Sequence, residues 1–177
     1  MEASLKRKWL ALSLWDKMGP RGFSEILNSS VNVADLLADF SLLDLIFSGP
    51  KHPGKPPVEK LLKQADELLD LEDNGKFKIL TVLDNQYPTP LKHIHTPPPV
   101  LYCQGDINIL RHPSIAVVGT RKPTQYGIDM TRKFTADLVR NKFVVVSGMA
   151  IGIDAFAHET VLENKGYTVA VLGCGLD

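Results

Sequence analysis

Three apolar runs in the second half of the chain each end in glycine. They cover Ile115–Gly119, Phe143–Gly148 and Thr168–Gly173, and helix-like sequence separates them. Continuous Val/Ile runs are typical of parallel strands buried on both faces, and a strand, a helix and a further strand form a βαβ unit. The pattern therefore predicts a parallel sheet. Ligands of open α/β sheets bind at the carboxyl edge, so we expect a site among the loops that follow the three runs.

The first 75 residues have helical patterning instead. Leu5, Trp9, Leu12 and Trp15 recur at the spacing of one helix face, and a break is expected at residues 18–22. Further helices are predicted through Phe23, Ile26 and Leu27, over Ala34–Phe47 and over Val58–Leu71. After Gly75 the pattern changes to short strands at Phe77–Leu83 and Val100–Cys103. We therefore expect an α/β protein with a helical domain over 1–75 and a Rossmann-like domain over 76–177.

Charge and composition limit the kinds of protein and ligand site that the chain can represent. The 177 residues contain 20 basic and 20 acidic side chains, which cancel, so any anion site must be built locally. Two cysteines form no disulfide framework, and no apolar run approaches the roughly 20 residues of a membrane span. A cytoplasmic protein without a membrane partner is expected. A doubly wound sheet has about six strands, so the three here predict a truncated domain, either natural or clipped.

The loop after the first strand has the residues of a phosphate site. Its candidates are Gly119, Thr120, Arg121, Lys122 and Thr124. Glycine lets backbone approach a ligand, Thr124 is placed to cap a helix from about Gln125, and Arg121 can contact phosphate oxygens. The competing interpretation is an ordinary strand-to-helix turn with a solvated arginine. The loop matches neither G-x-G-x-x-G nor a P-loop, which disfavours a conventional NAD or ATPase site.

The loops after the second and third strands supply the other candidates. After the second strand these are Ser147, Gly148, Met149, Ala150 and Gly152. Asp154 is expected to cap the following helix, with His158 on the same helix face. The two side chains could form a general-base pair, but a capping Asp and a hydrogen-bonded His are favoured. Gly173 and Gly175 give a loop that offers only backbone. We expect no metal and no cofactor.

These motifs together resemble a known family. Ile115–Arg121 with Tyr126-Gly127, Val146–Asp154 with Ala157-His158, and Val169–Asp177 closely resemble the DprA/Smf family of bacterial DNA-processing proteins. Upstream, Tyr87-Pro88 and Pro98–Tyr102 fit the same family. In residues 1–75 the likeness is looser, and Gly19-Pro20-Arg21 resembles the hairpin of a helix-hairpin-helix or SAM-like domain.

The resemblance implies a function and a site. Family members bind single-stranded DNA through an extended Rossmann fold, form homodimers in full-length form, and help to load the RecA recombinase during natural transformation and DNA recombination. It implies no catalysis. Carried over by motif, Gly119, Thr120 and Arg121 would line the DNA site with Ser147, Gly148 and Gly152. Two alternatives stay open: a Rossmann-type nucleotide-binding or nucleotide-cleaving enzyme, and an inactive truncated fragment.

Overall fold

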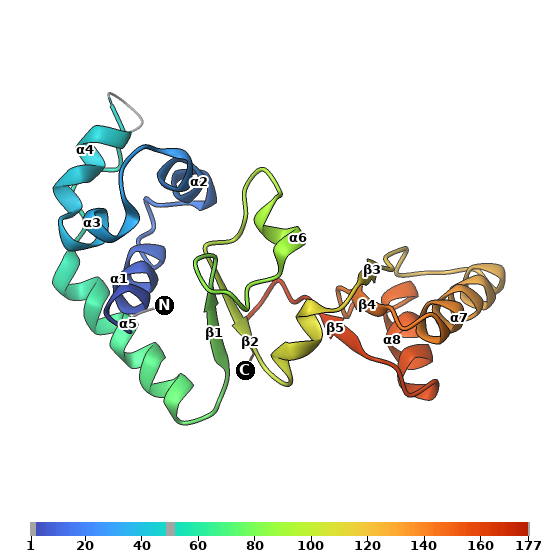
Figure 1. Cartoon of the computed structure of the whole chain (residues 1–177). Coiled ribbons are helices and arrows are strands. Elements are labelled where there is room, and N and C mark those ends of the chain that lie inside the picture. The colour runs from blue at the N-terminus through green and yellow to red at the C-terminus, as the bar shows by residue number, and fades with distance from the viewer. Residues whose placement is uncertain (1–2, 49–51, 177) are drawn as a thin grey trace. The chain divides into compact units, whose positions relative to one another are not determined.

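The computed structural model describes residues 3–48 and 52–176. The chain divides into two compact units, Met1–Gly105 and Asp106–Asp177, and each is described by itself with the labels of Figure 1. In the described part of the chain, no helix is long and apolar enough to cross a membrane.

The first unit joins short helices to a two-stranded hairpin. Its helices are α1 (Ala3–Ser13), α2 (Pro20–Asn28), α3 (Val33–Ala38), the 3-10 turn η1 (Phe40–Leu42), α4 (Leu43–Ile46), α5 (Val58–Asp73) and α6 (Thr89–Lys92). Its strands, β1 (Lys78–Thr81) and β2 (Val100–Cys103), pair antiparallel. The predicted helix at Val58 and the two predicted strands are confirmed, with β1 shorter than expected.

Two details of the helical pattern differ from the prediction. The single helix predicted over Ala34–Phe47 is wrong, because Asp39 is extended and its carboxylate accepts a hydrogen bond from the Ser41 amide. That bond ends α3 and starts a new turn. The predicted break also lies earlier, since α2 begins at Pro20. Proline suits the first position of a helix, where its missing N–H leaves no bond unmade.

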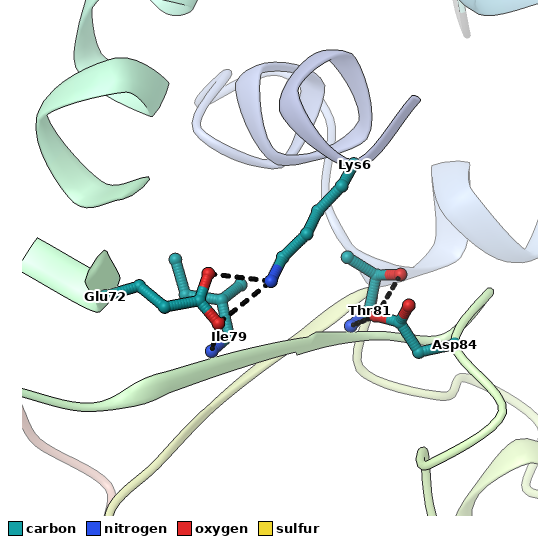
Figure 2. Close-up of polar contacts among 5 residues, drawn as sticks. All are labelled: Lys6, Glu72, Ile79, Thr81 and Asp84. Atoms are coloured by element: carbon teal, nitrogen blue, oxygen red, sulfur yellow. Dashed lines mark hydrogen bonds and ion pairs between the residues drawn. The ribbon is translucent and has the colours of Figure 1, made fainter. Parts of the chain in front are cut away.

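Buried and partly buried polar contacts connect the helices of the first unit to its hairpin. The Glu72 carboxylate, on α5, accepts hydrogen bonds from Lys6 Nζ at 2.7 and 2.9 Å and from the Ile79 amide at 3.0 Å (Figure 2). The Trp9 indole donates to the Pro99 carbonyl at 3.0 Å. The compact unit therefore ends after Gly105, whereas the sequence puts the domain boundary after Gly75.

The second unit is a parallel sheet covered by two helices. Its elements are the 3-10 turn η3 (Ile107–Arg111), β3 (Ser114–Ala116), α7 (Gln125–Arg140), β4 (Val144–Ser147), α8 (Ile153–Glu163) and β5 (Thr168–Ala170). The strand order is β3-β4-β5 and both pairings are parallel, as predicted. Helices α7 and α8 pack against β4 and against each other, so they lie on the same face (Figure 1).

The sheet register separates a covered face from an open one. Ile115, Val145 and Thr168 share one row, and Thr168 bonds to His158 of α8, so this row faces the helices. The core on this face consists of Val145, Ala157 and Val161, with Val117, Leu138 and Val139 packed against it. By alternation Val118 and Val171, which follow β3 and β5, lie on the other face, where they are 71% and 59% exposed. On the same face Val144, at the start of β4, is 2% exposed, so this face is open toward the strand ends and not at Val144. Burial on both faces, expected from the apolar runs, is thus wrong for β3, which is exposed throughout.

Candidate functional site

The three predicted loops meet at one edge of the second unit. Because β3, β4 and β5 are parallel, the segments that follow them lie at the same end of the sheet. Two of the loops touch directly: the Thr120 carbonyl, after β3, accepts a hydrogen bond from the Ile153 amide, after β4, at 3.2 Å. The sheet therefore brings the predicted segments together.

Asp154 connects these two loops. Its Oδ1 accepts from the Gly119 amide at 3.3 Å and its Oδ2 from the Gly148 amide at 3.1 Å. The carboxylate is 6% exposed, so a buried anion of the protein itself takes two of the amides expected to face a ligand. The prediction that Asp154 caps α8 is wrong, because Gly152 is the capping residue and Asp154 lies within the first turn. Asp154 instead joins the two loops, through a hydrogen bond to Gly119, which lies 35 residues away in sequence.

Close packing explains two of the glycines. A Cβ at Gly119 would lie 2.7 Å from the Ile153 side chain, and one at Gly152 would lie 2.3 Å from the Thr120 carbonyl oxygen. Gly152 also has φ +92°, which side chains rarely adopt. Ile153 was not singled out in the sequence, although it lies between Gly152 and Asp154. The Ile153 side chain packs the loop after β3 against the start of α8.

The charged side chains of the first loop face solvent. Arg121 and Lys122 are exposed, and within residues 3–48 and 52–176 no hydrogen bond or ion pair involves the Arg121 guanidinium. The loop backbone is held by the Thr120 hydroxyl, which accepts from the Lys122 amide at 3.2 Å. Thr124 caps α7 by accepting from the Gly127 amide at 3.2 Å, which confirms both the predicted cap and the predicted start at Gln125. Within the part of the chain that the structure describes, the loop therefore exposes two cations with no ion-pair partner.

Ser147 serves the sheet. Its hydroxyl donates to the Val117 carbonyl at 2.6 Å, and the residue is 3% exposed. The bond joins the ends of β4 and β3 below the loops. Ser147 thus supports the edge from inside, away from the surface that a ligand would touch.

His158 is connected to the sheet by two successive hydrogen bonds through Thr168. The Thr168 hydroxyl donates to the Val145 carbonyl at 2.8 Å, so it accepts from His158 Nδ1–H at 2.7 Å. Among the described residues the buried Nε2 has no hydrogen-bond partner. Burial lowers the pKa of His158, while the Asp154 charge opposes that shift. The favoured interpretation, a histidine held by hydrogen bonds at the sheet edge, is confirmed.

The remaining candidates lie on the surface of the edge. Met149 is 64% exposed and has φ +56°, and Ala150 is half-buried. Gly173 and Gly175, after β5, are both exposed, and a Cβ at Gly173 would meet nothing within 4 Å. In the described residues, no three His, Cys, Asp or Glu side chains gather where they could hold a metal ion. The edge therefore offers two cations, exposed backbone and a few apolar side chains.

Comparison with known proteins assigns the family. Residues 78–177 match the sequence model of the DNA recombination-mediator protein A family. That match covers more than half of the chain, and the chain belongs to this family, also called DprA or Smf.

Individual relatives agree with this assignment. Protein Smf of Synechocystis is 41% identical over 133 residues, which is 70% of this chain and 33% of that protein. The DNA processing protein DprA of Streptococcus pneumoniae is 41% identical over 114 residues, 64% of this chain and 40% of that protein. The crystal structure of S. pneumoniae DprA superposes with a TM-score of 0.63 at 28% identity, covering 98% of this chain and 57% of that one. The chain thus spans only part of the length of these relatives.

Proposed function

We propose that this chain binds single-stranded DNA at the carboxyl edge of the β3-β4-β5 sheet, with Arg121 as the main phosphate contact. The observation that carries the proposal is the exposed, unpaired guanidinium of Arg121 on a loop fixed by the Thr120 and Asp154 bonds. Because the loop backbone is already fixed, only the Arg121 side chain has to lose conformational entropy when it binds. Family membership and the DNA-processing names of the relatives support DNA as the ligand.

We further propose that the chain binds without catalysing a reaction. Asp154 uses both carboxylate oxygens on backbone amides, and His158 uses Nδ1 on Thr168. The two residues form no hydrogen bond with each other in the described structure, which disfavours a general-base pair. The Ser147 hydroxyl is buried and bonded, which disfavours a nucleophile.

The wider role follows from the family. We propose that the full-length protein acts in the cytoplasm as a homodimer and assists loading of the RecA recombinase onto single-stranded DNA, with residues 76–177 belonging to its DNA-binding domain. The description of the family as a recombination mediator supports this role. Co-sedimentation of a full-length relative with RecA, with and without DNA, tests it. Failure to associate in both conditions would contradict the RecA proposal while leaving DNA binding open.

Replacing Arg121 tests the site. Fluorescence anisotropy with a labelled oligo-dT at low salt should show that Arg121→Ala weakens binding by about 1–3 kcal/mol, the range for charge-assisted hydrogen bonds. The matched control is Arg140→Ala, which removes the same charge from the far end of α7, where Arg140 pairs with Asp137. Equal affinity of the two variants would remove Arg121 from the site. Binding by neither the parent chain nor the variants would contradict the proposed function.

A further inference from the structure

The loop after β4 presents two apolar side chains to solvent beside the cations. Met149 is 64% exposed and Ile151 is 71% exposed. Ile151 directly precedes Gly152, whose Cα is so close to the neighbouring loop that an added Cβ would lie 2.7 Å from Arg121 Cα. The backbone that carries Ile151 therefore packs against the backbone that carries Arg121, although the two residues lie 30 positions apart in sequence.

The backbone that carries these side chains is pinned at both ends. The Gly148 amide donates to Asp154, and the Ala150 carbonyl accepts from the Ala155 amide at 3.1 Å. Met149 between them has φ +56°, a conformation uncommon for a residue with a side chain. The surrounding bonds hold that conformation, and a costly backbone geometry that exposes an apolar side chain points to a role in binding.

The chemistry of this surface fits an unpaired nucleobase. In duplex DNA the base faces are stacked inside, so a protein meets mainly phosphates and base edges. A single strand also offers its base faces, which stack sequence-tolerantly on aromatic side chains next to a positively charged backbone contact. Covering an exposed aliphatic side chain with a base face removes apolar surface from water, which is also favourable. The exposed Arg121 and Lys122 are complementary in charge to phosphate, and the apolar pair lies on the loop whose backbone packs against that of Arg121.

We propose that Met149 and Ile151 form a base platform that selects single-stranded over duplex DNA, an inference that rests on the proposed function. Ile151 is the main specificity-determining residue, because it adjoins Arg121. Arg121 supplies affinity for the phosphate of either form, and the platform adds affinity only when a base is free to cover it.

An abasic oligonucleotide separates the two roles, because it keeps the phosphates and lacks the bases. In anisotropy titrations at low salt, the 177-residue chain should bind oligo-dT about three- to tenfold more tightly than an abasic oligonucleotide of equal length, from covering most of one aliphatic side chain. Ile151→Ser should bring the two affinities together by weakening oligo-dT alone. Ile151→Val should retain the preference.

Leu162→Ser is the matched control. Leu162 is 66% exposed, but it lies near the last residue of α8, far along the helix from the loop edge. This variant should leave both affinities unchanged. Equal binding of the two oligonucleotides by the parent chain would overturn the platform while leaving phosphate binding intact. A preference for oligo-dT that persists in Ile151→Ser would also overturn it. Binding of neither oligonucleotide would overturn the platform together with the proposed function.

Discussion

Removal of the Asp154 carboxylate should loosen the whole carboxyl edge. Asp154→Ala leaves the amides of Gly119 and Gly148 without their acceptor, in a position that is 6% exposed. Hydrogen bonds to a charged acceptor contribute about 1.5–3 kcal/mol each, and these two are long, at 3.3 and 3.1 Å. Because both bonds are long, we put each at about 1–2 kcal/mol, so the second unit should lose about 2–4 kcal/mol of stability.

The assay must report on the correct unit. Both tryptophans, Trp9 and Trp15, lie in the first unit, so their fluorescence does not follow this change. Amide hydrogen exchange reports on the second unit, with the Val145 amide as the probe, because that amide donates across the sheet to the Tyr167 carbonyl at 3.1 Å. Its free energy of exchange should fall by the same about 2–4 kcal/mol in Asp154→Ala.

A surface aspartate provides the control. Asp129 is exposed, and among the described residues its carboxylate accepts only from the Gln125 side-chain amide on the same helix, so Asp129→Ala should cost less than about 0.5 kcal/mol. A loss for Asp154→Ala within that small range would refute the idea that this carboxylate joins the two loops. The same variant should weaken DNA binding without touching DNA, because the loop that carries Arg121 loses its anchor.

Three further changes test other parts of the account. Gly152→Ala should destabilise the second unit by about 2 kcal/mol, because the φ of residue 152 is +92° and an added Cβ would meet the Thr120 carbonyl oxygen. Gly173→Ala should change stability little, so equal effects of the two variants in hydrogen exchange would contradict the packing argument. Burial lowers the pKa of His158, so the contribution of neutral His158 to stability is present above the ordinary histidine pKa of 6.5 and is lost as the pH falls below 6.5. His158→Gln should flatten this loss of stability at low pH, and an unchanged pH profile of stability would exclude His158 as its source. Lys6→Met should cost the first unit about 1–3 kcal/mol, measured by tryptophan fluorescence, because the largely buried Glu72 loses its cation; a neutral result would show that solvent replaces it.

Local signals allowed much of the architecture to be predicted. Thr124 three residues before Gly127 is a capping pattern that depends only on neighbouring residues, and the apolar runs ending in glycine depend on the period of a strand. The short strand over Val100–Cys103 was predicted with its observed bounds. Each of these features is specified within a few residues.

Features that depend on tertiary contacts were not predictable in the same way. Asp154 has the sequence context of a helix cap, and its bond to Gly119 exists only because the sheet brings the two loops together. Ser147 has the context of a ligand loop, but its hydroxyl points to the Val117 carbonyl of the neighbouring strand. The exposure of Ile151 reverses what an apolar residue after a buried strand suggests. Sequence patterns thus identified the carboxyl edge of the sheet. Tertiary contacts decide which of its residues hold the loops in place and which are exposed to a ligand.

The central claim is that DNA meets the chain at this edge, and an NMR titration tests it most directly. Amide shifts of the labelled 177-residue chain should be followed as oligo-dT is added at low salt. The account predicts changes concentrated at residues 119–122, 148–152 and 173–175. At the same oligonucleotide concentration these changes should be smaller in Arg121→Ala and unaffected in Arg140→Ala. Shifts confined to residues 3–48 or 52–105, or none at saturating oligonucleotide, would contradict it.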